Sequence, residues 1–150
     1  MRAVAKHEFV VRCTPEEAFD YLSDIRNELH WNPQTCQSVE MVTEDPIGEG
    51  TRFRAKWKGS PELEVEITHF ERPHIWRAHT AGSMESNFEG AVEPHPDGAT
   101  VRTELEMIPH GWMKLFFPIF KLIFTRAEAN VPKQIQEAMM ERYGDSPAAA

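Results

Sequence analysis

The sequence predicts an α+β fold in which a curved antiparallel sheet of about six to seven strands wraps around a long C-terminal helix, with two short helices after the first strand. Three observations lead to this prediction. Residues 39–107 alternate between apolar and polar side chains, as strands with one wet face do. A strong helix start at Thr14-Pro15-Glu16-Glu17 precedes them. Residues 111–124, GWMKLFFPIFKLIF, follow them and read as an apolar helix.

The N-terminal elements follow from local signals. Residues 3–12 alternate as a first strand. Thr14 is suited to cap the next helix and Pro15 to its first position, and the two acids that follow favour its positive end. A second short helix is expected over residues 24–29, and it must end before Pro33 because the residue before a proline disfavours helical geometry.

The middle of the chain is expected to form an antiparallel meander. The clearest strand begins at Glu62, where acidic and apolar residues alternate strictly to Ile67. Glycine and proline turns separate the segments, so neighbouring strands pair with one another. The expected strands are residues 36–43, 50–57, 62–70, 74–80, 84–93 and 99–108.

The C-terminal helix is expected to pack an apolar face on the sheet. Pro118 and Pro132 fall on the opposite, polar stripe, where they allow the helix to bend around the core. A second interpretation leaves part of the apolar surface exposed for dimerisation or ligand entry. The residues predicted to face inward are Trp112, Leu115, Phe116, Ile119, Phe120, Ile123 and Ala127.

Composition excludes several classes of function. The formal net charge of -8 argues against nucleic-acid binding and against docking on an anionic membrane. Cys13 and Cys36 lack a CxxC spacing, so free thiols in a reducing cytoplasm are expected. The N-terminus lacks a signal-peptide core, and no stretch reaches the about 18 apolar residues of a membrane span. We therefore expect one cytoplasmic domain over residues 1–150, without stable membrane insertion.

Five motifs in order resemble a known superfamily. They are TPEEAFDYLSD at 14–24, WNP at 31–33, IGEGT at 47–51, EITHFERP at 66–73 and GATV at 98–101. Together they resemble the START/Bet v 1-like (SRPBCC) superfamily, in its polyketide cyclase/dehydrase-like branch. The resemblance implies a helix-grip fold with a cavity between the sheet and the C-terminal helix. Members of this superfamily bind lipids, sterols, polyketides, plant hormones or quinones, and some are cyclases or hydrolases.

A ligand pocket is expected where the apolar parity of the strands faces the helix. Aromatic rings and methionines suit a planar or apolar ligand, although the same residues could simply fill a close-packed core. The expected lining is Phe53, Ala55, Trp57, Val65, Ile67, Trp76, Met84, Phe88, Leu105, Met107, Trp112, Phe116, Ile119, Phe120 and Ile123.

Two polar residues are candidates within this pocket. His69 shares a parity with Val65 and Ile67, so a strand without a bulge would turn its imidazole inward to orient a carbonyl or transfer a proton. The alternative is a histidine hydrogen-bonded at the strand end. Ser86 is expected to point inward because Met84 and Phe88 share its parity.

These features predict a protein that binds a hydrophobic or aromatic small molecule, such as a lipid or polyketide, without a cofactor. Two alternatives stay open: a cofactor-free cyclase, dehydratase or aromatase in which His69 shuttles a proton, and an interaction module that uses the C-terminal helix. HExxH, GxSxG and a Gly-rich phosphate loop are absent, and the histidines are scattered, so no metal site is expected. A monomer or a homodimer is compatible with the sequence.

Overall fold

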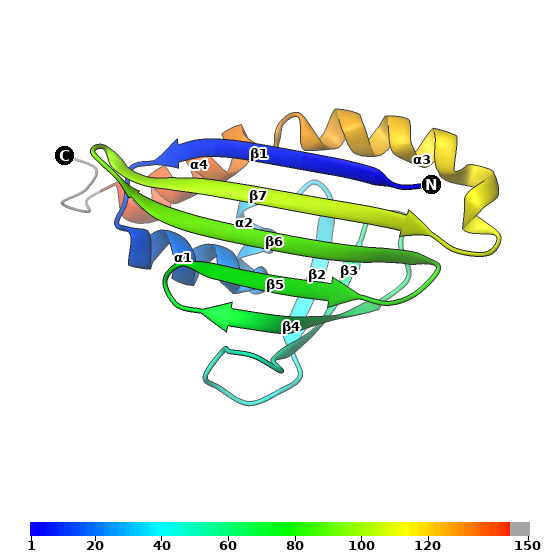
Figure 1. Cartoon of the computed structure of the whole chain (residues 1–150), viewed down its shortest axis with the longest axis horizontal. Helices are drawn as coiled ribbons and strands as arrows, with labels where there is room; N and C mark the ends of the chain where they lie inside the picture. The colour runs from blue at the N-terminus through cyan, green and yellow to red at the C-terminus, as the bar shows by residue number, and fades with distance from the viewer. Residues whose placement is uncertain (145–150) are drawn as a thin grey trace.

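A computed structural model describes residues 1–144 of the chain. Its centre is a seven-stranded antiparallel sheet in the order β1-β7-β6-β5-β4-β3-β2, which confirms the predicted meander with the first strand added beside the last (Figure 1). The strands are β1 (Ala3–Val11), β2 (Cys36–Met41), β3 (Arg52–Trp57), β4 (Leu63–Glu71), β5 (Ile75–Thr80), β6 (Met84–His95) and β7 (Gly98–Pro109).

Short helices follow β1 as the sequence predicts. Helix α1 (Pro15–Ser23) begins with a capping box, in which the Glu17 N–H donates to Thr14 Oγ1 at 3.1 Å. The Thr14 N–H in turn donates to Glu17 Oε1 at 2.9 Å, so both groups are satisfied before the helix begins. A 3₁₀ turn, η1 (Ile25–Asn27), and one further helical turn, α2 (Glu28–Trp31), lead into β2.

The C-terminal helix bends so far that it forms two helices. Helix α3 (Met113–Glu128) contains Pro118, and α4 (Val131–Tyr143) carries Pro132 in its first turn. A proline ring clashes with the carbonyl four residues earlier and removes one helical hydrogen bond, which favours a break before Pro132, although α3 accommodates Pro118 without one. Within a first turn the missing N–H has no helical partner to lose. The predicted bend is therefore confirmed, and it falls at residues 129–130.

The compact core lies at one end of the sheet. Helices α1, α2 and α4 gather behind that end, whereas α3 runs along the β1 edge toward the other end (Figure 1). Phe19 is fully buried and its ring meets Trp76 edge-on, with 5.2 Å between ring centroids. The buried cluster comprises Phe9, Val11, Cys13, Ala18, Phe19, Tyr21, Trp76, Val92, Ala99, Val101, Ile135, Ala138 and Met139.

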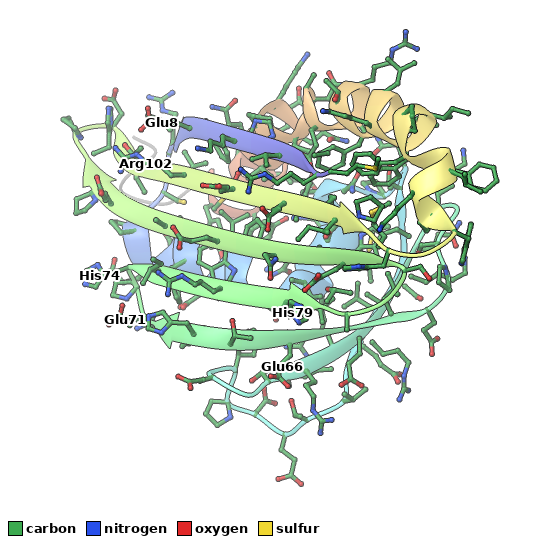
Figure 2. The ribbon with its side chains drawn as sticks, turned by 45° about the vertical axis from the view of Figure 1, so that its right-hand side comes forward. Glu8, Glu66, Glu71, His74, His79 and Arg102 are labelled. Atoms are coloured by element: carbon green, nitrogen blue, oxygen red, sulfur yellow. The ribbon has the colours of Figure 1, made fainter. Side chains whose placement is uncertain are left out.

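The opposite face of the sheet is covered with charged side chains. Figure 2 shows Glu8 and Arg102 close together on the neighbouring strands β1 and β7, where they form an ion pair. Arg102 also binds Glu93 at 2.8 Å, and His79 on β5 binds Glu85 at 2.9 Å. This outer face is exposed to solvent, as the acid/apolar alternation predicts. The alternate, apolar residues of each strand therefore face the helices.

Candidate functional site

On β6 and β7, the concave face of the sheet is only partly covered at the end away from the core. Phe88 on β6 pairs with Leu105 on β7, and Ser86 pairs with Met107, and all four are half-buried. At the core end, by contrast, the paired Val92 and Val101 are 1% and 0% exposed. The half-buried end faces away from α1, and α3 is the helix that contacts β1 and β7 beside it. The half-buried concave surface and the inward side of α3 therefore lie next to each other, and we refer to these two surfaces together as the groove.

The wall contributed by α3 is aromatic. Phe117 is 3% exposed, and its ring stacks on Phe120 with 5.9 Å between centroids. Phe120 stacks in turn on Phe124 at 5.7 Å. Met113, at the start of the helix, and Glu128, at its end, share this inward side because residues three and four apart lie on one helix face. The inner face of α3 is thus Met113, Phe117, Phe120, Phe124 and Glu128.

The structure corrects the predicted orientation of this helix. Of the helix residues predicted to line the pocket, Phe120 is half-buried. The other four lie on the exposed side: Trp112 (62% exposed), Phe116 (53%), Ile119 (64%) and Ile123 (62%). Apolar residues surround most of the circumference of α3, so helical periodicity does not distinguish the half that meets the sheet from the half that meets solvent.

His69 also differs from its prediction, because β4 carries a bulge. The pairing with β5 shifts between Ile67 and His69, so that Phe70 rather than His69 takes the inward position opposite Trp76. His69 faces outward, with its Nε2 3.0 Å from Glu71 Oε2. One extra residue in a strand exchanges the two faces for every residue beyond it. His69 is therefore placed away from the groove.

The remaining predicted residues divide between core and groove. Trp76 lies flat across Gly90 on the neighbouring strand and is 2% exposed. The buried group is Phe53, Ala55, Val65, Ile67 and Trp76. The half-buried group, which borders the groove, is Trp57, Met84, Ser86, Phe88, Leu105 and Met107.

A polar cluster lies at the point where the aromatic wall ends. His7 is on the inward parity of β1, and its Nε2 is 3.1 Å from Glu128 Oε2 in the last turn of α3. The two side chains are 16% and 17% exposed, so solvent reaches them only slightly. Burial raises the pKa of Glu128, and the hydrogen bond from His7 acts in the opposite direction.

A second carboxyl group with a raised pKa lies in α2. Glu28 in α2 accepts hydrogen bonds at Oε2 from Trp57 Nε1 at 2.7 Å and from Asn32 Nδ2 at 3.0 Å. Burial raises its pKa most strongly, the two hydrogen bonds lower it, and the negative charge of Glu128 raises it further. Glu28 nevertheless keeps partial access to solvent.

This cluster was not found from the sequence, although signals for two members exist. His7 shares the parity of Phe9 and Val11, and Glu128 continues the four-residue spacing of Phe120 and Phe124. A carboxyl group with a raised pKa beside an imidazole can hydrogen-bond a polar ligand group, and such groups can accept or donate protons. Among residues 1–144, no group of three His, Cys, Asp or Glu side chains is arranged to hold a metal ion.

Two open depressions occur on the outer face of the sheet, and unlike the groove they are lined mainly by charged side chains. Arg77 and Glu89 line one of them and bind each other at 2.7 Å. Glu8 and Arg102, also an ion pair, line the other. Their charged groups already have partners on the sheet. The groove under α3 combines apolar walls with a polar end, so it is the better candidate site.

Comparison with known proteins places the chain in a family. The family model for polyketide cyclase/dehydrase and lipid transport matches residues 2–140. No curated protein is significantly similar to this chain in sequence. Within the described part of the chain, none of the helices has both the length and the apolar character needed to cross a bilayer.

Solved structures share the fold at low sequence identity. The crystal structure of Ara h 8.0201 matches with a TM-score of 0.67 and 16% identity over 94% of this chain and 99% of that one. Protein SA2116 of unknown function from Staphylococcus aureus gives 0.71 and 8% identity over 96% and 97%. Norcoclaurine synthase from Thalictrum flavum, in complex with dopamine and hydroxybenzaldehyde, gives 0.64 and 13% identity over 97% and 88%. With its helix-grip architecture and a family match along nearly its whole length, the chain belongs to the polyketide cyclase/dehydrase and lipid transport family of the START/Bet v 1-like superfamily.

Proposed function

We propose that the protein binds an apolar or aromatic small molecule in the groove between the concave face of the sheet and α3. The observation that carries this proposal is the placement of an aromatic helix wall opposite a half-buried apolar strand surface, with a polar cluster at one end. Binding sites for small molecules combine apolar walls with a few placed polar groups in this way.

The cluster suggests what the ligand carries. His7, Glu28 and Glu128 would meet one end of a molecule whose body lies along Phe120 and Phe124. A hydroxyl, amine or carbonyl group at that end would find donors and acceptors, whereas a purely apolar end would leave them without a new partner. The norcoclaurine synthase neighbour is in complex with dopamine and hydroxybenzaldehyde, which are aromatic molecules with polar groups, and this supports the same class here.

The binding proposal can be tested by filling the groove. Leu105→Trp adds an indole to the half-buried inward face of β7, and Glu104→Trp adds the same group to the outer face next to it. Titration with 1-anilinonaphthalene-8-sulfonate, a fluorescent aromatic probe, should show weaker binding for Leu105→Trp and unchanged binding for Glu104→Trp. Native mass spectrometry of the freshly purified protein should also show a bound small molecule that organic extraction releases. Equal affinity in both variants would contradict the proposed location.

An acid–base enzyme is the second candidate, and the His7–Glu128 pair with Glu28 nearby favours it. On a β-hydroxy carbonyl substrate, one of these three side chains would take the proton from the carbon next to the carbonyl. Another would protonate the departing hydroxyl, which leaves as water while the carbon–carbon double bond forms. His7→Ala should then abolish dehydration of a β-hydroxyketone probe, followed by NMR, while probe binding persists. Turnover that survives in His7→Ala would remove the support for this candidate.

Several broader expectations remain proposals. We propose a single domain over residues 1–150, working in the cytoplasm as a monomer or homodimer, without a cofactor and without a nucleic-acid partner. Cys13 and Cys36 support the location, because both are free and buried and burial raises the pKa of each thiol to about 12. Cell fractionation and sedimentation of the purified protein would test the location and the oligomeric state.

A further inference from the structure

The side of α3 that faces away from the sheet is apolar and unusually exposed. Six large apolar residues there are between 53% and 81% exposed. Elsewhere in residues 2–144, exposed large apolar side chains are scattered and reach at most 44%, at Met140. We define the outer face of α3 as Trp112, which directly precedes the helix, with Leu115, Phe116, Ile119, Leu122 and Ile123.

The charges around this outer face are all positive. Lys114, Lys121 and Arg126 are exposed, and none has an ion pair or hydrogen bond to another side chain within residues 1–144. The sole acidic residue of α3, Glu128, points inward to His7. The whole chain carries a net charge of -8, so α3 is a basic region on an acidic protein. Such an asymmetry favours a negatively charged partner.

We propose that the outer face of α3 docks on the surface of an anionic lipid bilayer. Helices that lie in the membrane interface combine apolar and aromatic residues on one side with lysines and arginines beside them. Trp112 and Phe116 would enter the boundary between headgroups and acyl chains, and the cations would approach the lipid phosphates. The inner face of the same helix lines the groove, so docking would place the groove beside the lipid.

Charge also distinguishes this partner from a second copy of the chain. Two outer faces packed together would bring Lys114, Lys121 and Arg126 of both copies into one interface, and α3 offers no outward acid to pair with them. An anionic bilayer offers negative charge over the whole contact area. The negative net charge of the protein opposes such docking. Charges act mainly within a Debye length of about 8–10 Å, however, so the positive charge on α3 determines the electrostatic interaction with the bilayer.

Co-sedimentation with lipid vesicles tests the proposal. The full chain should bind vesicles of phosphatidylcholine mixed with phosphatidylserine more strongly than vesicles of phosphatidylcholine alone, and added salt should weaken the binding. Lys121→Glu should reduce the affinity at least about fivefold, because each cation near an anionic surface contributes about 1 kcal/mol. Ile119→Glu should reduce it further. Met140→Glu, the same type of change on α4, is the matched control and should bind like the parent protein.

Two further measurements keep the result interpretable. Tryptophan fluorescence should shift to shorter wavelength on anionic vesicles in the parent protein, and much less in Trp112→Phe. Leu105→Trp, which fills the groove, should still bind vesicles, so loss of ligand binding and loss of docking are distinguishable. Equal binding to neutral vesicles, absence of binding, or a dimer in sedimentation that Ile119→Glu dissociates would each overturn the proposal.

Discussion

His7 Nε2 lies 3.1 Å from Glu128 Oε2, although 121 residues separate the two in the chain. The contact joins the inward side of the first strand to the last turn of α3, one residue before the chain bends toward α4. The two side chains are 16% and 17% exposed, and burial raises the pKa of the Glu128 carboxyl while the hydrogen bond with His7 lowers it.

Removing the Glu128 carboxyl should weaken recognition of a polar ligand group. In Glu128→Ala, affinity for 2-naphthol should fall about tenfold or more, because a hydrogen bond to a charged group contributes about 1.5–3 kcal/mol. Affinity for 2-methylnaphthalene, which has a similar shape and no donor, should change little. Titration calorimetry with both compounds measures the difference. A similar loss for both would indicate collapse of the groove instead of a lost polar contact.

The buried carboxyl of Glu28 should make stability depend on pH. Its pKa is raised by burial, so the folded state holds the proton more tightly than the unfolded state, and its contribution to stability is complete below the ordinary carboxyl pKa of about 4.3. That contribution is lost as the pH rises from there through the raised pKa. Glu28→Gln cannot ionise and can still accept from Trp57. Urea unfolding from pH 4 to 7 should show a shallower decline in the variant.

Glu66→Gln is the control for this pH series. Glu66 lies on the outer face and is exposed (Figure 2), so removing its charge should leave the slope of stability against pH as in the parent protein. If Glu28→Gln and Glu66→Gln give the same slope, the Glu28 carboxyl does not titrate as a buried group.

Gly90 should be intolerant of even one added methyl group. A Cβ at this position would stand 2.3 Å from the Trp76 ring, which lies across the glycine in the core. The ring would have to move from the aromatic cluster with Phe19 and Phe88, so we expect Gly90→Ala to lose about 1–3 kcal/mol of stability. Gly48→Ala, where a Cβ meets nothing within 4 Å, is the control. Urea unfolding of both variants measures the difference.

Both cysteines should be unreactive while the protein is folded. Cys13 is 1% exposed and Cys36 is 3% exposed, and burial raises the pKa of each to about 12, so almost no thiolate forms near neutral pH. Ellman's reagent should label neither thiol in native buffer and both in urea. Rapid labelling of either one in native buffer would show that its region opens readily.

Much of the fold was predictable because its signals are local. The capping box at Thr14 and Glu17, the alternation in β4 and β7, and the glycine and proline turns each act within a few residues. The bend near Pro132 is local as well, since a proline disfavours a continuous helix through its own position. Local signals also predicted the pairing of consecutive strands, because a short turn between two strands places them side by side in the sheet.

The site was decided by tertiary structure. A bulge after Ile67 turned His69 outward, and it depends on how β4 pairs with β5. The sheet meets the Phe117 side of α3, although periodicity allowed the opposite side as well. His7 and Glu128 come from β1 and α3 and meet only when the chain has folded. Local signals therefore specify the elements and their order, because these depend on near neighbours. The buried faces and the polar contact depend on packing between distant segments.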